Sequence, residues 1–440
     1  MPKIDSQFVS DELARCNRCG FCIRTCPTYR VTGSEGNVAR ARNELVRSVQ
    51  RGDDELMEEM YDRFFQCLMC GACTDACLTD VETDEIMVEA REAYRDTHGH
   101  PWLQRFIFRE LLPYPDKLAR YVRMISLGKN TGISGLARNL GLLKIVSQKL
   151  AKADSLVEKM PPKFFRDQMK DLGFEDAEDL PEGYLRLKPA GEPTGPSVAY
   201  FVGCGSNFQV PSQVVGAIRL MSAGGCDIIV PPNCCCGLPP YSYGDREAAR
   251  VLAEMNVKTL SAIDVDVIVT ECGSCSSFLK KYPKLLAESD LLEAAEALQG
   301  KTRDATEILF ELDLPEPREP DLRVTYHDPC HLGRKQKITK EPREMLTRIP
   351  GVELVEMKEA DWCCGGAGSY NMSEPEMSDR IIARKTKHVA ETSADVLVTA
   401  CPACVIQLAR GVREAGLDMQ VKHLSEVMEE AYLPPVDAGD

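Results

Sequence analysis

The chain has 440 residues, of which 44% are hydrophobic and 28% charged, a composition typical of a folded protein of two to four domains. Its net charge of -15 argues against a nucleic-acid partner, because phosphate binding needs a basic surface. Its 20 cysteines are too few, at this length, for a small disulfide scaffold.

No apolar run approaches the roughly eighteen residues that span a bilayer. The N-terminus, MPKIDSQFVSDELARC, has no apolar stretch of the kind found in a signal peptide. We therefore expect a cytoplasmic protein whose thiols are free to bind metal.

Two cysteine motifs with the same spacing lie near the N-terminus, CNRCGFCIRTCP at residue 16 and CLMCGACTDAC at residue 67. Tight C-x-x-C-x-x-C loops let three thiolates hold one [4Fe-4S] cubane, and in two-cluster ferredoxins the fourth cysteine ligates the other cluster. The spacing predicts two cubanes, one bound by Cys16, Cys19, Cys22 and Cys77, and the other by Cys67, Cys70, Cys73 and Cys26.

A pair of zinc sites is the alternative for these motifs. Zinc would need only two C-x-x-C pairs at each site, so it does not account for motifs of four cysteines. Leu78 stands where the first motif has Pro27, but that proline shapes the turn and is not a ligand.

Helical periodicity marks the residues around these motifs. Apolar residues in the segment 38–65 include Leu45, Val49, Met60 and Phe64 at helical spacing, and ETDEIMVEAREAYRD at 82–96 predicts another helix. We predict an α-helical ferredoxin domain over residues 1–100, with its motifs in loops at the ends of helices.

Residues 101–165 are basic, with twelve Lys or Arg against four Asp or Glu, and Leu118, Tyr121, Val122 and Ile125 form a helical apolar stripe. Such a stretch could dock on a partner or lie peripherally on the cytoplasmic membrane, and the alternative is helices that pack on the protein's own core. Together with a linker, PAGEPTGPS, this predicts a basic helical connector over residues 101–196.

The rest of the chain contains one cysteine pattern twice. The first copy consists of Cys204, the pair Cys235-Cys236, Cys272 and Cys275, and the second of Cys330, the pair Cys363-Cys364, Cys401 and Cys404. Matching cysteines differ by 126 (204 to 330), 128 (235 to 363) and 129 (272 to 401), so the copies align with small insertions. This internal duplication predicts two metal-cluster sites of five thiols each.

Two further cysteines fall outside this pattern. Cys226 aligns with Val352, an apolar strand position, which predicts a buried small side chain. Cys234 aligns with Trp362, and we expect neither cysteine to be a primary ligand.

Short strands alternate with helical stretches in both copies. VAYFV, CDIIV and DVIVT in the first copy and VTYH, VELVEM and DVLVT in the second predict two α/β domains with parallel strands, residues 197–315 and 316–440. Because cysteines follow these strands, we expect the sites at the carboxyl ends of the strands, with helix N-termini stabilising the thiolates. Gly237 and Gly365 would allow the backbone to approach closely beside each cysteine pair.

Ionisable residues flank some of these cysteines. His327, Asp328 and His331 surround Cys330, and Glu271 precedes Cys272. They could act as acids, bases or ligands, or else cap helices and form hydrogen bonds behind the ligands.

Two ferredoxin motifs followed by two C...CCG...CxxC sets resemble the cysteine-rich CCG-domain iron-sulfur proteins, over nearly the whole chain. The segments CGFCIRTCPTYRVTG, YHDPCHLGR, CCGGAGSYNMS and TACPACVIQLARGVREAGLDMQV look most like the glycolate oxidase and lactate-utilisation iron-sulfur subunit group, and the D-type polypeptide of heterodisulfide reductases is a further relative. In heterodisulfide reductases a five-cysteine set holds a noncubane [4Fe-4S] cluster. The resemblance implies one or two such clusters here, one on Cys204, Cys235, Cys236, Cys272 and Cys275, and one on Cys330, Cys363, Cys364, Cys401 and Cys404.

The resemblance implies an iron-sulfur electron-transfer subunit of a hetero-oligomeric oxidoreductase. It would relay electrons from an FAD-containing 2-hydroxy-acid dehydrogenase subunit, of the lactate or glycolate type, to a quinone or another carrier. An electron-transfer flavoprotein or a membrane quinone-reactive subunit would be a further partner. No dinucleotide fingerprint is present, so we expect no flavin in this chain.

The alternative is a catalytic subunit of the heterodisulfide reductase type, which reduces or forms thiol disulfides at a noncubane cluster. The details of the motifs favour the relay, and the complete sets of ten cysteines favour the reductase. The sequence assigns no catalytic residue.

Overall fold

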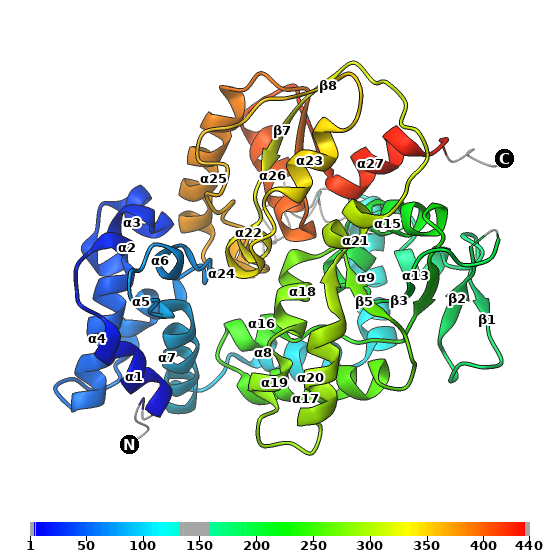
Figure 1. Cartoon of the computed structure of the whole chain (residues 1–440). Coiled ribbons are helices and arrows are strands. Elements are labelled where there is room, and N and C mark those ends of the chain that lie inside the picture. Colours follow the sequence, from blue (N-terminus) through cyan, green and yellow to red (C-terminus); the bar gives the residue numbers. More distant parts are fainter. Residues whose placement is uncertain (1–3, 5, 133–134, 136–158, 190, 436–440) are drawn as a thin grey trace.

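The computed structural model describes residues 4, 6–132, 135, 159–189 and 191–435. A helical N-terminal region lies beside two sheets that are covered by helices (Figure 1). The mixed architecture and the parallel strands that the sequence predicted are both present.

The N-terminal region is helical and surrounds the two ferredoxin motifs. Helices α4 (Ala39–Arg51) and α7 (Thr83–His98) pack together and contribute Val46, Val49 and Ile86 to a core shared with Phe64. Gly52 ends α4 in a left-handed conformation, which glycine adopts without steric cost. The shorter helices of this region are α1 (Gln7–Arg15), α2 (Phe21–Thr25), α3 (Pro27–Thr32), η1 (Glu35–Asn37), η2 (Glu58–Met60), α5 (Tyr61–Phe65) and α6 (Ala72–Asp75).

Three further helical segments follow, α8 (Trp102–Phe106), η3 (Ile107–Leu111) and α9 (Pro115–Asn130). The predicted apolar stripe lies on α9, yet no residue of α9 is buried, and Tyr121 and Ile125 are 42% and 57% exposed. Leu118 of the stripe is half-buried and packs against the core that the helical region shares with the first α/β region, so the stripe packs in part on the protein's own core. The segment LARNLGLLKIVSQKLAK at residues 136–152, for which we predict the same helical apolar pattern, lies outside the described residues.

The first sheet has six strands in the order β1-β2-β4-β3-β5-β6. Strands β3 to β6 are parallel to one another. At one edge, β2 pairs antiparallel with β4, and β1 pairs antiparallel with β2. Both edge strands come from residues that the sequence analysis assigned to the connector. The strands are β1 (Glu175–Asp176), β2 (Leu185–Leu187), β3 (Ser197–Tyr200), β4 (Asp227–Val230), β5 (Val267–Thr270) and β6 (Thr302–Asp304).

The second sheet has four parallel strands in the order β10-β9-β7-β8. Its central strands repeat those of the first sheet, because β7 and β9 occupy the places of β3 and β5. The strands are β7 (Leu322–His327), β8 (Val352–Leu354), β9 (Val396–Thr399) and β10 (Gln420–His423).

Helices cover the faces of both sheets. Those of the first α/β region are α13 (Phe165–Gln168), α14 (Cys204–Phe208), α15 (Pro211–Ala223), α16 (Leu238–Ser242), α17 (Arg246–Leu260), α18 (Gly273–Leu279), α19 (Tyr282–Leu285), α20 (Leu292–Lys301) and α21 (Ala305–Glu311). Those of the second are α22 (Cys330–Gln336), α23 (Glu341–Thr347), α24 (Tyr370–Ser373), α25 (Pro375–Ala390), α26 (Pro402–Glu414) and α27 (Leu424–Tyr432).

The two α/β regions share a hydrophobic core. Alternate residues of β3, such as Val198 and Tyr200, and of β7, such as Val324 and Tyr326, belong to this one cluster, which α15 and α27 also line. These two helices approach closely, since a Cβ on Gly216 would lie 3.0 Å from the Ser425 carbonyl oxygen. The two copies of the duplicated unit are therefore packed together as one body.

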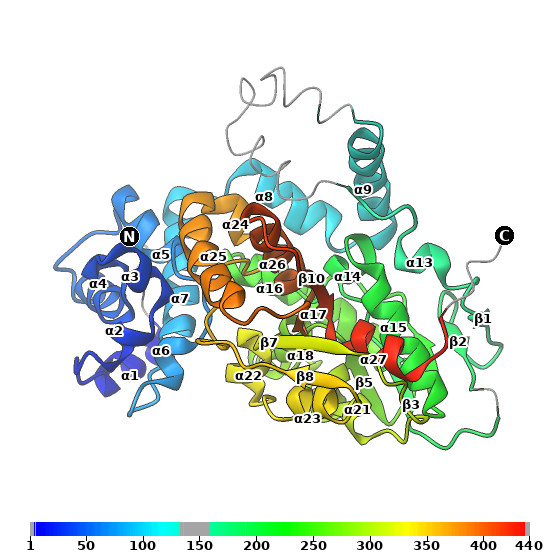
Figure 2. The ribbon, with the colours of Figure 1, turned by 90° about the horizontal axis from the view of Figure 1, so that it is seen from above.

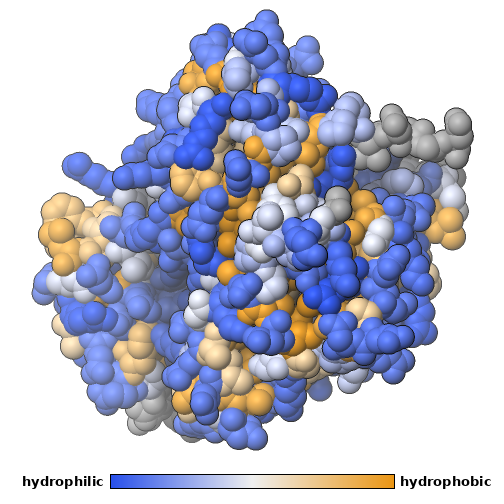
Figure 3. Space-filling model, turned by 45° about the vertical axis from the view of Figure 1, so that its right-hand side comes forward, coloured by the Kyte–Doolittle hydropathy of each residue, from blue (hydrophilic) through white to orange (hydrophobic). Residues whose placement is uncertain are grey.

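The helical N-terminal region contacts both α/β regions. Helix α3 packs against α25, and α6 against α22, as the two ribbon views also show (Figures 1 and 2). Hydrophilic residues cover most of the face seen in Figure 3. Within the described part of the chain, no helix combines the length and the apolar character needed to cross a membrane.

Candidate metal-cluster sites

The first ferredoxin motif lies in a loop that leads into α2. Burial, together with the nearby Cys16 and Cys26 thiols, raises the pKa of Cys22. Cys19 is exposed. Cys77 Sγ lies 3.4 Å from Thr79 Oγ1 after the end of α6, which packs against α2. The contact between α2 and α6 thus places the two motifs side by side.

The second motif borders a small cavity that is partly open to solvent. Cys67, Cys70 and Cys73 line it together with Cys26 of the first motif. Buried Arg42 also lines it, with Nη1 3.8 Å from Cys26 Sγ. The structure therefore brings together the four cysteines that the sequence predicted for one cubane.

The five thiols of the first CCG set lie in one continuous chain of contacts. Cys204 is within hydrogen-bonding reach of Cys235, Cys235 of Cys236, Cys236 of Cys275, and Cys275 of Cys272. Hydrogen bonds from Cys235 and Cys275 lower the pKa of Cys236, because they stabilise its thiolate.

The second CCG set repeats this order with Cys330, Cys363, Cys364, Cys404 and Cys401. Cys364 Sγ lies 3.5 Å from Cys404 Sγ. Hydrogen bonds from Cys363 and Cys404 lower the pKa of Cys364, as their counterparts do for Cys236. The two copies therefore place equivalent thiols in equivalent surroundings.

Backbone geometry at the cysteine pairs explains the glycine that follows each of them. Gly237 and Gly365 have φ values of 95° and 82°, which L-residues with a side chain rarely adopt. A Cβ on Gly365 would also lie 3.2 Å from the Ser378 carbonyl oxygen. The turns direct the amides of Leu238 and Gly366 at Cys236 and Cys364.

Helix N-termini hold the other thiols. Cys204 and Cys330 are the first residues of α14 and α22, and Cys272 and Cys401 cap the N-termini of α18 and α26. Free amides and the positive end of the dipole face the thiols there, particularly in the 13-residue α26. These positions follow strands, as the sequence predicted.

Neighbouring sites adjoin each other. Cys272 of the first CCG set is within hydrogen-bonding reach of Cys401 of the second. Cys70 of the ferredoxin region packs in one hydrophobic cluster with Cys363, and it interacts electrostatically with Cys330. The thiol groups therefore form one line, from the ferredoxin motifs through the second CCG set to the first.

Buried and half-buried cations lie along this line of thiols, and the sequence analysis did not identify them. Arg334 lies near Cys70 and Cys330 and donates to Asp361 Oδ2 at 2.8 Å. The Lys385 ammonium, with no exposed surface, lies near Cys364, and burial lowers its pKa to about 8. Arg334 follows Cys330 by one helical turn, which is a usable signal, whereas no sequence motif marks Lys385 or Arg42.

Cys226 and Cys234, the two cysteines outside the pattern, have partners other than the thiols of the CCG sets. Cys226 lies in the apolar core between the sheets, and burial raises its pKa to about 11. Cys234 Sγ lies 3.3 Å from Asn256 Oδ1 and 3.7 Å from the Leu252 carbonyl oxygen. Both thiols therefore have protein surroundings that account for them.

Three of the flanking ionisable residues have structural partners. Asp328 accepts two hydrogen bonds from Arg343, at 2.7 and 2.8 Å. Glu271 accepts a hydrogen bond from the Tyr200 hydroxyl. His331 Nδ1 lies 3.1 Å from Ser274 Oγ, which is itself 3.8 Å from Cys401 Sγ.

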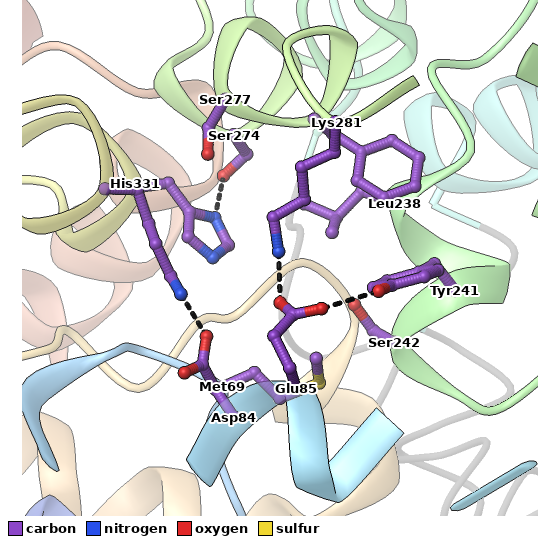
Figure 4. A pocket seen from close by; sticks show the side chains of 12 residues that line it. Met69, Asp84, Glu85, Leu238, Tyr241, Ser242, Ser274, Ser277, Lys281 and His331 are labelled. Carbon is purple, nitrogen blue, oxygen red and sulfur yellow. Dashed lines mark hydrogen bonds and ion pairs between the residues drawn. The ribbon is translucent and has the colours of Figure 1, made fainter. Parts of the chain in front are cut away.

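A second small cavity, partly open to solvent, lies where the helical region meets both α/β regions (Figure 4). Glu85 of α7 stands in it between Lys281 and Tyr241, and the Tyr241 hydroxyl donates to Glu85 Oε2 at 2.6 Å. Ser274 and His331 line the opposite side. The cavity therefore adjoins the Cys401 end of the second CCG set through Ser274.

The donor sets fit iron-sulfur clusters. Each CCG set offers five thiols, of which only Cys204 and Cys330 are not fully buried, and soft thiolates are the ligands that iron-sulfur clusters prefer. Buried cations and helix N-termini offset the negative charge that thiolates and clusters bring.

Three protein-family models match the chain. The 4Fe-4S dicluster domain matches residues 12–81, and the cysteine-rich domain matches residues 198–280 and again 324–409. The linker region of the glycolate oxidase iron-sulfur subunit matches residues 99–157.

Two of three curated relatives span the chain almost completely, and the third spans about half of it. The probable glycolate oxidase iron-sulfur subunit of Bacillus subtilis is 32% identical over 98% of this chain and 97% of its own. The D-type polypeptide of the dihydromethanophenazine:CoB--CoM heterodisulfide reductase of Methanosarcina barkeri is 26% identical over the same shares of both chains. Lactate utilization protein A of Shouchella clausii is 28% identical over 53% of this chain and 98% of its own.

Proposed function

The chain belongs to the cysteine-rich CCG-domain iron-sulfur proteins, in the group of the glycolate oxidase iron-sulfur subunits, and on this premise we propose that it is an electron-transfer subunit of a larger oxidoreductase. It relays electrons from a flavoprotein subunit that oxidises a 2-hydroxy acid, such as lactate or glycolate, to a quinone or another carrier. The names of the full-length relatives and of lactate utilization protein A support this class of complex.

The continuous line of thiol sites carries the proposal. Cys70 packs with Cys363, and Cys401 reaches Cys272, so that each site lies against the next. When bound, iron-sulfur clusters supply one-electron transfer. The protein's part is to hold the sites in this order and to keep most thiols of the CCG sets away from water.

We assign the ligands as the sequence analysis predicted them. Two cubanes would use the eight cysteines of the ferredoxin motifs, and two further clusters the ten cysteines of the CCG sets. The shared cavity of Cys26 with Cys67, Cys70 and Cys73 supports the exchange of the fourth ligand between the motifs. The domains would span residues 1–100, 101–196, 197–315 and 316–440, with β1 and β2 joining the first sheet from the connector.

A second function, thiol-disulfide reduction in the manner of a heterodisulfide reductase, is favoured by one specific observation. A small cavity, partly open to solvent, is lined by Ser274 and His331 beside the second CCG set, and Ser274 Oγ lies 3.8 Å from Cys401 Sγ. A disulfide substrate would need such access to a cluster, whereas a relay does not.

The experiment that separates the two functions uses the anaerobically purified chain, reduced by an artificial donor. A relay reoxidises with a quinone but shows no saturable turnover of a thiol disulfide, and 2-hydroxy-acid oxidation requires an added flavoprotein subunit. Disulfide turnover that Cys364→Ser or Cys236→Ser abolishes would overturn the relay and establish the reductase.

A further inference from the structure

His327 closes β7 beside the second CCG set. Its side chain is fully buried, and one ring nitrogen lies within 4.8 Å of the sulfur atoms of both Cys364 and Cys404. A histidine among thiols is unexpected at this point, because the aligned position of the first copy, 126 residues earlier, is the buried Phe201.

The hydrogen bonds of His327 define which nitrogen is available. Nδ1 lies 3.1 Å from the Ala360 carbonyl oxygen, which only accepts, so Nδ1 carries the proton. The same carbonyl accepts from the Lys385 ammonium at 2.8 Å and from the Asp328 amide at 3.1 Å, which holds it in place. Nε2 of the neutral ring is then unprotonated and has a free lone pair.

Among the residues that the structure describes, none offers a hydrogen-bond partner to Nε2, although it is buried. An unsatisfied buried nitrogen is destabilising, so a partner at this position would stabilise the folded protein. A histidine whose other ring nitrogen donates to a backbone carbonyl is the usual arrangement of a metal ligand.

We propose that His327 Nε2 is an iron ligand of the second CCG site, which would make this site a mixed nitrogen and sulfur centre while the first site remains all-thiolate. The inference rests on the proposed function, because it requires a cluster on Cys330, Cys363, Cys364, Cys401 and Cys404. It adds a ligand that the duplicated cysteine pattern does not contain.

The mixed ligand set would make the reduction potentials of the two CCG sites differ. Histidine in place of cysteine raises the reduction potential of Rieske centres, because imidazole brings less negative charge to the iron than a thiolate does. The second CCG site is therefore expected to have a higher reduction potential than the first.

The test uses the full-length chain with its clusters, prepared with natural-abundance and with ¹⁵N-labelled histidine. In the paramagnetic state of the second site, pulsed electron-nuclear spectroscopy is expected to detect a strongly coupled nitrogen that changes with the label. His327→Phe, which copies Phe201 of the first site, should remove this coupling. His423→Asn should keep it, because both ring nitrogens of His423 already have partners, Ser425 Oγ and the Glu271 carbonyl.

A second variant measures the potential. His327→Cys should keep the iron content and lower the midpoint potential of one cluster, because a thiolate replaces the imidazole. The labelling experiment on the wild-type chain still tests whether a histidine nitrogen binds the cluster if a variant does not fold.

The outcomes separate this inference from the proposed function. A full iron content with no coupled histidine nitrogen, or with a weak coupling that His327→Phe leaves unchanged, would overturn the ligand assignment alone. A chain that binds no cluster at the second CCG set would overturn both.

Discussion

His423 is a histidine that burial keeps neutral. It caps α27 by accepting from the Ser425 amide, and burial lowers its pKa to about 4 from an ordinary value near 6.5. The unfolded chain therefore binds more protons between these values, so stability is present above pH 6.5 and is lost as the pH falls toward 4. The effect amounts to roughly 3 kcal/mol across this window.

We predict that His423→Asn flattens the acid side of the stability profile. The difference in free energy of unfolding between wild type and variant should shrink as the pH falls from 6.5 to 4.5. Unfolding by denaturant under anaerobic conditions at several pH values measures it, and parallel profiles would show that His423 is not the responsible group.

Substitution of individual cysteines tests which thiols are ligands. Cys364→Ser should remove one cluster, about four irons, because Cys364 lies at the centre of the second set between Cys363 and Cys404. Cys226→Val is the matched control, since Cys226 lies in the apolar core and valine fills a similar volume. Iron analysis of both variants shows which of the two thiols is a ligand. Loss of iron from the Cys226 variant would refute the alignment of the two copies.

Among the structural elements, α7 has a special place because it joins the ferredoxin region to the first α/β region. Burial alone would raise the pKa of Glu85, but the Lys281 ammonium and the Tyr241 hydroxyl lower it to about 2. Glu85→Ala should cost about 3 kcal/mol, because it leaves the Lys281 charge without its buried partner.

The control for this prediction lies at the N-terminal end of the same helix. Glu82 pairs with Lys284 at 3.8 Å, and both side chains are about half exposed, so Glu82→Ala should change stability by roughly 0–1 kcal/mol. Thermal unfolding of the two variants measures the difference, and equal losses would mean that α7 is not held by the Glu85 pair.

Elements with a strong periodic pattern could be predicted from sequence, and others could not. Continuous β-branched runs such as DVIVT and DVLVT identified β5 and β9, because strands buried on both faces have this composition. β1 and β2 are only two and three residues long and have no buried residue, so no apolar pattern marks them. They form because the edge strand β4 offers unpaired backbone groups.

At the scale of the whole molecule, the duplication predicted the content of each CCG set but not the order of the sites. Spacing along the chain groups cysteines locally, whereas the contacts of Cys70 with Cys363 and of Cys272 with Cys401 join residues far apart in sequence. These contacts depend on how α6 packs on α22 and how the two α/β regions share a core. The buried cations Arg42 and Lys385 were likewise not predictable, because their partners, such as the Arg63 and Ala360 carbonyl oxygens, also lie far from them in sequence.

The iron content of the anaerobically purified chain tests the account most directly, since a relay through four adjoining sites requires all four to bind clusters. The proposed assignment predicts about sixteen irons per chain and no stoichiometric zinc. About eight irons per chain, in a protein that still passes electrons from its flavoprotein partner to a quinone at the full rate, would contradict it.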